Sequence, residues 1–343
     1  MKPVKIGNKL IGKEQPTFII AEIGYNFENM DQAKKSIEAA AKAGADAVKI
    51  QTFKADTLTT KGLMFPKEAG GGSQYEEFKR FELSEEAHRE MFNHAKKNGI
   101  ILFSTPSHPH DVDLLEKFRV PVYKIGSDDL LNLPLLEHIA KKGKPIIMST
   151  GMSTLSEVDK AVSTIFKMGN HDLILLHCLS NYPVHNLEYV NLKAIQTLEK
   201  AFKVPVGFSD HTMSLSIPVA AVVLGAAVIE KHFTIDKKLD VPDAFFSANP
   251  EEFEKMVKGI REVESALGDG IKRPAKSEIK MRKDTRKSII ATKDIKAGTR
   301  ITKEMVDIKR PSHGLAPEFL QFVLGRKAKV DIKMDEPITR DKI

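Results

Sequence analysis

The sequence contains a single cysteine, Cys178, and no tryptophan. One cysteine excludes a disulfide framework and any zinc site built from several thiolates. Long apolar runs are also lacking: the longest, Leu215–Ile229, is shorter than the roughly 20 residues of a membrane span and contains Pro218 and Gly225. Met1–Ile11 has no apolar stretch of signal-peptide length. We therefore expect a cytoplasmic protein that does not enter a membrane.

An excess of positive charge is confined to the end of the chain. Residues 271–343 carry 20 Lys and Arg against 10 Asp and Glu, a net charge of +10, whereas residues 1–270 carry 33 against 36, a net charge of −3. Such a basic end is typical of a nucleic-acid arm, a membrane-surface patch or a module that serves an anionic substrate. It lacks the interleaved aromatic residues of a single-strand platform, so we expect no nucleic-acid partner.

The composition is that of a globular protein, with 41% hydrophobic and 29% charged residues. Apolar runs bounded by turn residues predict eight strands. Their apolar, β-branched openings are typical of parallel strands that are buried on both faces. The predicted strands are Thr17–Gly24, Asp46–Phe53, Gly99–Pro106, Val120–Ser127, Lys144–Gly151, Asp172–Ser180, Val204–Thr212 and Ala227–Thr234.

Segments with helical periodicity alternate with these strands, as at Asp31–Ala43 and Ser156–Met168. Eight β-then-α units predict an α/β fold of the (β/α)8 TIM-barrel type. A doubly wound sheet is the main rival, but no Gly-x-Gly-x-x-Gly opens any of the helices. Pro250–Leu267 is predicted to be the last barrel helix, since a proline is tolerated in a first turn.

The predicted domain organisation is a barrel over residues 1–268, a polar and basic linker over 269–284 and a compact basic unit over 285–343. The connection after the second strand, residues 54–83, is long and contains Gly70-Gly71-Gly72. Such a connection is either a functional lid or a solvated insertion, and the sequence leaves both interpretations open.

Polar residues stand at the ends of all eight predicted strands, the ends that face the active site in TIM barrels. Lys49 and Lys124, with hydroxyls nearby, suit an anion such as phosphate, because the ammonium groups supply charge and the hydroxyls supply directed donors. Two alternatives stay open. The lysines pair with Glu22 or Glu230 and bind nothing, or one of them forms a Schiff base in a lysine-dependent aldolase.

His211 and His232 end the seventh and eighth predicted strands, which are neighbours in a closed barrel. Neighbouring strands can direct both imidazoles at one point, and two imidazoles with water and substrate oxygens suit a divalent metal such as Mn²⁺. The alternative is that both are ordinary core histidines. Asp210 and Glu230 are close enough in sequence to orient the rings.

Short motifs lie at the ends of the predicted strands in a fixed order: AEIG at 21–24, VKIQ at 48–51, FSTP at 103–106, YKIGS at 123–127, STGM at 149–152, LHCLSNYP at 176–183, GFSDHT at 207–212 and EKHFT at 230–234. KRPSHG follows at 309–314. Together they resemble the sialic acid synthases, the NeuB-type enzymes that make nonulosonic acids. The resemblance covers almost the whole chain, and KRPSHG is similar to the family's C-terminal antifreeze-like (SAF) domain.

The resemblance implies a TIM barrel followed by a SAF domain, and an enzyme that condenses phosphoenolpyruvate with an open-chain N-acetylated mannose-type sugar. The sugar would be N-acetylmannosamine or 2,4-diacetamido-2,4,6-trideoxymannose, which yield sialic or legionaminic acid, plus phosphate. The alternative is a pseudaminic acid synthase that acts on the corresponding altrose. His211 and His232 would bind Mn²⁺, with Mg²⁺ or Co²⁺ as alternatives, as a Lewis acid on the aldehyde oxygen.

The same resemblance implies roles for other residues. Glu22 and Gln51 would lie at the reacting centre, and Asp243 would bind sugar hydroxyls. Arg310 would recognise the N-acetyl group in the other subunit's active site, because the SAF domain caps the partner barrel in a homodimer. Phosphoenolpyruvate would be bound by Lys49, Thr105, Lys124, Ser127, Asn181, Tyr182 and Ser209.

Two segments depart from the family pattern. Tyr25-Asn26-Phe27-Glu28-Asn29 stands where an Asn-His-Asn-Gly-like turn is usual, and Val241-Pro242-Asp243-Ala244 stands where Gly-Pro-Asp-His is usual. The second change removes a polar group near the sugar. Residues 244–247 (AFFS) are similar to pseudaminic acid synthases, whereas 123–127 and 309–314 are more similar to sialic and legionaminic enzymes. The sequence therefore defines the reaction class better than the sugar.

Overall fold

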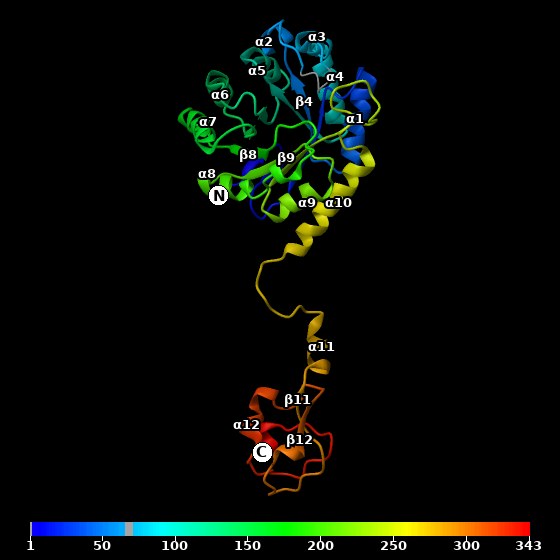
Figure 1. Cartoon of the computed structure of the whole chain (residues 1–343), viewed down its shortest axis with the longest axis vertical. Helices are drawn as coiled ribbons and strands as arrows, with labels where there is room; N and C mark the ends of the chain where they lie inside the picture. The colour runs from blue at the N-terminus through cyan, green and yellow to red at the C-terminus, as the bar shows by residue number, and fades with distance from the viewer. Residues whose placement is uncertain (1, 66–70) are drawn as a thin grey trace. The chain divides into compact units, whose positions relative to one another are not determined.

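The computed structural model describes residues 2–65 and 71–343. The chain divides into two compact units, Met1–Gly268 and Asp269–Ile343. The first unit is a ring of strands surrounded by helices (Figure 1). Gly70, the first of the three glycines in the long connection after the second strand, lies outside the described residues.

Eight parallel strands of the first unit close into a barrel in chain order, with the last strand hydrogen-bonded to the first. This confirms the predicted TIM barrel, and each strand lies inside its predicted range. The observed strands are shorter than the predicted ones at one or both ends; β6, for example, begins at Tyr123 and ends at Ile125, inside the predicted Val120–Ser127. They are β3 (Phe18–Gly24), β4 (Ala47–Thr52), β5 (Ile101–Pro106), β6 (Tyr123–Ile125), β7 (Ile146–Ser149), β8 (Leu173–Cys178), β9 (Val206–Asp210) and β10 (Val228–His232).

A helix follows each barrel strand, and the apolar face of each helix packs on the outside of the barrel. Local sequence sets the helix starts: Thr154 with Glu157, and Asn249 with Glu252, form capping boxes at the N-termini of α7 and α10. Pro250 is the first residue of α10, as predicted. The barrel helices are α1 (Met30–Lys42), α4 (Glu85–Lys97), α5 (Pro109–Glu116), α6 (Leu133–Ala140), α7 (Leu155–Lys167), α8 (Ala194–Phe202), α9 (Ser216–Val223) and α10 (Pro250–Leu267).

The interior of the barrel changes from apolar to charged along the strands. Because side chains alternate along a strand, Phe18, Ile20 and Glu22 of β3 share one face. Phe18 and Ile20 belong to an apolar cluster inside the barrel, whereas Glu22 lies toward the carboxyl end of the strand. The cluster also contains Val4 and Ile6 of a short hairpin, β1 (Val4–Ile6) and β2 (Lys9–Ile11), that the sequence analysis missed. Apolar packing therefore fills one end of the barrel and leaves the polar groups at the other.

The long connection after β4 contains two further helices, α2 (Ala55–Leu58) and α3 (Gln74–Arg80). Its apolar side chains pack against the loop between β10 and α10, which contains Asp243. We call this cluster the aromatic wall. It consists of Tyr25, Phe53, Leu58, Phe78, Phe81, Leu239, Val241 and Ala244.

The second unit has its own apolar core, which includes Ile289, Val323 and Ile338. Two strands, β11 (Ser288–Ala291) and β12 (Val306–Lys309), pair antiparallel in it. A helix, α11 (Glu278–Thr285), occupies the end of the segment that was predicted to be a linker, and none of its residues is buried. The unit also contains α12 (Leu320–Val323) and the short 3-10 helices η3 (Lys303–Met305), η4 (Pro317–Phe319) and η5 (Arg340–Lys342); η2 (Leu187–Tyr189) lies in the barrel.

In the part of the chain that the structure describes, no helix combines the length and the apolar character that crossing a membrane requires.

Candidate active site

Two lysines and two glutamates meet inside the mouth of the barrel. Lys49 Nζ lies 2.8 Å from Glu22 Oε2 and 3.9 Å from Glu230 Oε2, and Lys124 Nζ lies 3.8 Å from Glu230 Oε1. All four side chains are at most 6% exposed. Both ammonium groups therefore lie beside one carboxylate, that of Glu230.

Hydroxyl groups surround the two lysines. Lys49 donates to Thr105 Oγ1 at 3.1 Å, and Lys124 donates to Ser149 Oγ at 2.6 Å and to the carbonyl of Ile125 at 3.0 Å. Ser209 donates to Glu230 Oε1 at 2.9 Å. The contacts from the lysines to Glu230 are longer than hydrogen bonds, so each ammonium group has an N–H left that can donate a hydrogen bond to an anion.

The two glutamates differ in their affinity for protons. Burial raises the pKa of Glu22 more than the charge of Lys49 lowers it, and the charge of Glu230 adds to the rise. Burial also acts to raise the pKa of Glu230, but the charges of Lys124 and Lys49 outweigh it and lower this pKa. Of the two carboxyl groups, Glu22 therefore holds a proton more readily than Glu230 does. Gln51 Nε2 donates to Glu22 Oε1 at 3.2 Å and orients it.

The pKa values of the two lysines are shifted in opposite directions. Burial alone would lower the pKa of Lys49, but Glu22 and Glu230 raise it above its usual value. Burial lowers the pKa of Lys124, and Glu230 only partly opposes this. The alternative in which Lys49 forms an ion pair with a glutamate therefore agrees with the structure, since Lys49 Nζ lies 2.8 Å from Glu22 Oε2. It does not exclude an anion, because the contacts of both lysines with Glu230 are too long to be hydrogen bonds.

His211 and His232 lie side by side at the ends of β9 and β10, with ring centroids 5.4 Å apart. His211 Nδ1 lies 2.8 Å from the carbonyl oxygen of Leu179, so this nitrogen is the protonated one and Nε2 carries the free lone pair. His232 Nδ1 is buried, has no hydrogen-bond partner among the described residues and lies 3.5 Å from Asp243 Oδ2. Burial lowers the pKa of both imidazoles, and the charge of His211 adds to the effect on His232. Two neutral imidazoles are what a divalent metal requires.

Asp210 and Glu230 do not orient the histidine rings, contrary to one sequence interpretation. Lys231 Nζ lies 2.6 Å from Asp210 Oδ2 and donates to the carbonyl of Thr212 at 2.7 Å, while Asp210 Oδ1 accepts from Thr212 N at 2.9 Å. Asp210 and Lys231 alternate along their strands with the inward-facing residues, so they lie on the outer face of the barrel. We call this group the outer latch of β9 and β10.

Aromatic rings line the mouth next to the histidines. Tyr182 lies 4.1 Å from His211 and 5.9 Å from His232, measured between ring centroids. Phe246 lies 5.1 Å from His232 and 6.1 Å from Tyr182. Asn181 is exposed beside them, and its side chain forms no hydrogen bond within the described residues.

Ser127 lies on the lysine side of the mouth. Its Oγ accepts from Gly151 N at 3.0 Å and lies 3.1 Å from Cys178 Sγ. A side chain at position 151 would bring a Cβ to 2.7 Å from this sulfur and 2.8 Å from this hydroxyl, so only glycine permits the approach. The buried thiol is part of the packing around Ser127.

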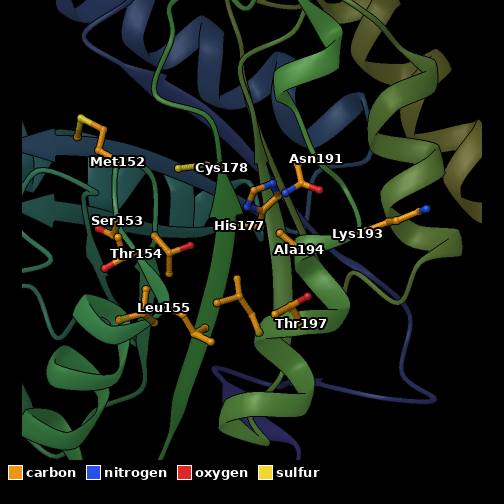
Figure 2. Close-up of a pocket in the computed structure, with 13 residues that line it drawn as sticks. Met152, Ser153, Thr154, Leu155, His177, Cys178, Asn191, Lys193, Ala194 and Thr197 are labelled. Carbon is orange, nitrogen blue, oxygen red and sulfur yellow. The ribbon is translucent and has the colours of Figure 1, made fainter.

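A separate cavity of about 530 Å³ lies beside the mouth, at the starts of α7 and α8. His177 and Cys178 leave β8 in opposite directions there, with the imidazole toward Asn191 and the sulfur toward Met152 (Figure 2). His177 Nε2 lies 2.7 Å from the carbonyl of Val190. His177, a polar residue at a strand end, therefore faces outward, and the alternation of side chains already indicates this.

The structure brings together most of the residues that the sequence singles out. Arg310 is the exception: it is exposed in the second unit, and its place relative to the barrel is not defined. The residues at the mouth of the barrel are Glu22, Lys49, Gln51, Thr105, Lys124, Ser127, Asn181, Tyr182, Ser209, His211, His232 and Asp243.

Sequence reasoning did not assign site roles to Ser149 and Tyr25. It considered Glu230 as a partner of the lysines, and its place two residues before His232 on one strand puts both on the same face. Ser149 ends β7 and could have been found in the same way. Tyr25 follows β3. Its position could not be predicted from the sequence, because it depends on packing against the loop that contains Asp243.

The fold and the mouth of the barrel define a class of enzyme. The barrel presents buried ammonium groups and hydroxyls for an anion, and next to them neutral imidazoles and a carboxyl group of raised pKa for the chemistry of a second substrate. This is the arrangement of a barrel enzyme that joins an anionic substrate to a carbonyl compound.

The chain belongs to the NeuB family, whose sequence profile matches residues 36–272; the SAF domain profile matches residues 286–343. It is 44% identical to the N,N'-diacetyllegionaminic acid synthase of Campylobacter jejuni over 94% of this chain and 98% of that protein. It is 41% identical to a pseudaminic acid synthase of the same species over 98% of both chains. A crystal structure of the N-acetylneuraminic acid synthetase of Leptospira borgpetersenii in complex with citrate is similar, with a TM-score of 0.75 and 35% identity over 82% of this chain and 95% of that one.

Proposed function

We propose that the protein condenses phosphoenolpyruvate with an open-chain N-acetylated mannose-type sugar to give a nonulosonic acid and inorganic phosphate. The observation that carries this proposal is the shared pocket of Lys49 and Lys124 beside His211 and His232. A Schiff-base aldolase needs one deprotonated lysine, and Glu22 and Glu230 raise the pKa of Lys49 against the effect of burial, so only Lys124, whose pKa burial lowers, would suit that alternative. The relatives named above carry out syntheses of this class of product.

The bonds made and broken follow from the two substrates. C3 of phosphoenolpyruvate forms a bond to the aldehyde carbon of the sugar, and the aldehyde oxygen takes a proton and becomes a hydroxyl. The oxygen of water bonds to C2, and the bond between C2 and the phosphate oxygen breaks. Phosphate leaves, and a 2-keto acid extended by three carbons remains.

The residues of the pocket have distinct tasks in this reaction. Lys49 and Lys124 bind the phosphate and carboxylate of phosphoenolpyruvate, with the hydroxyls of Thr105, Ser127 and Ser149 as directed donors around them. The hydroxyl of Ser209 donates to Glu230 and lies beside them. Asn181 and Tyr182 border the same site from the loop after β8.

Glu22 acts on the acceptor side of the pocket. Its raised pKa suits it to hold the proton that the aldehyde oxygen receives, and Gln51 keeps it in place. Asp243 faces the same region, and burial raises its pKa to about 7, so it can accept or donate a hydrogen bond to a sugar hydroxyl.

His211 and His232 fit a divalent metal, most simply Mn²⁺. The fit rests on the free Nε2 of His211 and on the buried, unpartnered Nδ1 of His232. Within the described residues no third His, Cys, Asp or Glu completes a cluster with them, so oxygens of water and substrate would supply the remaining ligands. When bound, the ion would act as a Lewis acid on the aldehyde oxygen.

The second unit completes the site in our proposal. Its net charge is +10 over residues 271–343, against −3 for the rest of the chain, and its exposed Arg310 is available to a second copy. A homodimer in which this unit caps the partner barrel would bring Arg310 to the sugar's N-acetyl group and exclude water from the reaction. We place the reaction in the cytoplasm, where a buried free thiol such as that of Cys178 stays reduced.

The test is phosphate release from phosphoenolpyruvate in the presence of Mn²⁺ and one acceptor at a time. The acceptors are N-acetylmannosamine, 2,4-diacetamido-2,4,6-trideoxymannose and the corresponding altrose, and the product mass identifies the acid. We expect phosphate release to depend on acceptor and metal, and His211→Ala and His232→Ala to abolish it with circular dichroism unchanged. The proposal is wrong if the wild-type dimer releases no phosphate with any acceptor, and the metal role is wrong if wild-type rates persist in chelator.

A further inference from the structure

His88 of α4 is a buried histidine that the proposed reaction does not use. Its side chain is 1% exposed and packs on the outside of the barrel. Nδ1 of His88 lies 2.7 Å from the carbonyl oxygen of Ser84, and Nε2 lies 2.8 Å from Thr52 Oγ1. Thr52 ends β4 and Ser84 is the N-cap of α4. His88 therefore joins the residues that stand on the two sides of the long connection after β4.

The two hydrogen bonds define the protonation of the imidazole. Because a carbonyl oxygen only accepts, Nδ1 of His88 carries the proton, and Nε2 accepts from the hydroxyl of Thr52. Burial lowers the pKa of His88. The hydrogen bond to Ser84 and the charge of Glu85 oppose this effect, and the charge of Lys54 adds to it. At neutral pH the ring is therefore uncharged, and both of its nitrogens have a partner.

The hydrogen bonds continue into the next strand. Ser104 Oγ of β5 lies 2.6 Å from Thr52 Oγ1 and 3.1 Å from the carbonyl oxygen of Ile50. Thr52 and Ser104 are at most 3% exposed. A buried polar network whose members all have partners holds them in one arrangement. We call His88, Thr52 and Ser104 the hydroxyl network of β4 and β5.

This network stands where apolar side chains are found elsewhere on the same strands. The outward residues that precede Thr52 and Ser104 are Val48, Ile50 and Leu102, and all three belong to the apolar core around the barrel. Hydroxyls buried in such surroundings cost free energy unless they are hydrogen-bonded. The change from apolar to polar occurs at the mouth end of both strands, where their inward residues belong to the active site.

Two residues of the active site are the immediate chain neighbours of the network. Gln51 precedes Thr52, Thr105 follows Ser104, and Gln51 and Thr105 are directly paired across the two strands. Because side chains alternate along a strand, the network lies outside the barrel and the paired residues point inward. The network therefore holds the piece of backbone that directs Gln51 and Thr105 into the mouth of the barrel.

We propose that His88 is a positioning residue of the reaction. Its hydrogen bond from Thr52 keeps Gln51 and Thr105 in the geometry that the two substrates require. The inference rests on the proposed function, since it is in that reaction that Gln51 and Thr105 serve the substrates. His88 touches neither substrate, and its bond to Ser84 anchors the ring to α4.

Two substitutions separate the two hydrogen bonds of the ring. The amide of asparagine reaches the place of Nδ1, and the amide of glutamine reaches the place of Nε2. His88→Asn thus keeps the donor to Ser84 and loses the acceptor for Thr52, whereas His88→Gln does the reverse. We expect kcat/KM for phosphoenolpyruvate to fall about tenfold in His88→Asn and less than about threefold in His88→Gln, with similar midpoints of urea unfolding.

Further variants identify the path of the effect. Thr52→Val keeps the shape of the side chain and removes its hydroxyl, so it should reproduce the loss of His88→Asn and add little to it in the double variant. His94→Gln is the matched control, because His94 is on the same helix and its Nε2 lies 3.0 Å from Glu38 Oε1, away from the network. It should retain wild-type kinetics.

A second readout needs no substrate. Hydrogen exchange at the amides of Gln51 and Thr105 in the unliganded protein measures how firmly the two strand ends are held. Faster exchange in His88→Asn than in His88→Gln supports the inference. Equal exchange in the two variants, or kinetic losses that follow the urea midpoint alone, overturns it. If the wild type releases no phosphate with any acceptor, the proposed function has failed, and the exchange rates then decide the inference by themselves.

Discussion

At the scale of single residues, the site depends on groups that burial makes unequal. Glu22 and Glu230 are both buried and both contact Lys49, yet their pKa values move in opposite directions, because only Glu230 has a second lysine beside it. The sequence placed both carboxylates at strand ends. It could not distinguish them, because the number of nearby cations depends on β6 closing against its neighbours.

Asp111 lies outside the site and allows a test of how burial shifts the pKa of a carboxyl group. It lies in the first turn of α5, is 4% exposed, and burial raises its pKa to about 6 despite a hydrogen bond from Ser107 N. Between pH 4 and 6 the folded protein therefore holds a proton that the unfolded chain has released, so this carboxyl group costs stability as the pH rises through that range.

As the pH rises from 4 to 7, we expect the free energy of unfolding of Asp111→Asn to increase relative to that of wild type. The expected increase is about 2 kcal/mol, after allowance for partial solvation. Urea unfolding followed by circular dichroism at several pH values measures this difference. Asp113→Asn on the same helix is the control: hydrogen bonds from Lys142 and His138 lower the pKa of Asp113, so its stability difference from wild type should stay nearly constant over this pH range. A pH-independent difference between Asp111→Asn and wild type would contradict the assignment.

At the scale of elements, alternation along the strands separates two functions. On β9 and β10 the inward residues Ser209, His211, Glu230 and His232 belong to the site, whereas Asp210 and Lys231 form the outer latch. The latch joins directly paired residues of the two strands, so it holds them in register and with them the two imidazoles. The sequence pattern predicted the strands, but the pairing of Asp210 with Lys231 depended on the register.

When Lys231 is replaced by an uncharged residue, the buried carboxylate of Asp210 loses its ion-pair partner. We expect Lys231→Met to lower the free energy of unfolding of the barrel by about 3–5 kcal/mol and to weaken Mn²⁺ binding, measured by denaturation and by electron paramagnetic resonance of the free ion. The double variant Lys231→Met, Asp210→Asn should lose less than the sum of the single changes. Lys255→Met, which breaks an exposed pair with Glu251, should change stability by less than about 1 kcal/mol. If the outer latch does not hold the two imidazoles in place, the Mn²⁺ affinity will be unchanged in all variants.

At the scale of the whole molecule, the barrel and the SAF domain are separate units with opposite net charge. Helix α11 exposes Ile279 at 46% and Met281 at 64%, and Arg310 is also exposed. These features are consistent with the proposed homodimer, in which each active site combines residues of two chains.

Mixed dimers test this arrangement. Arg310→Ala and His211→Ala subunits, each inactive alone, are combined in equal amounts. If Arg310 acts in the partner's barrel, a mixed dimer contains one site with both residues intact, and we expect recovery of about a quarter of wild-type activity. Sedimentation confirms the dimer. No recovery, with mixed dimers present, would show that Arg310 acts on its own barrel or not at all.

The sequence by itself determined the eight β-then-α units and the order of the polar strand ends, because apolar periodicity and side-chain alternation are local properties. It also determined where α10 begins, through Asn249 and Pro250. Only the tertiary structure decided that Lys49 and Lys124 share Glu230, and that the segment after β4 packs on the loop of Asp243 behind Tyr25. These contacts join residues far apart in the chain, and their distances are set by barrel closure and packing, which no local pattern encodes.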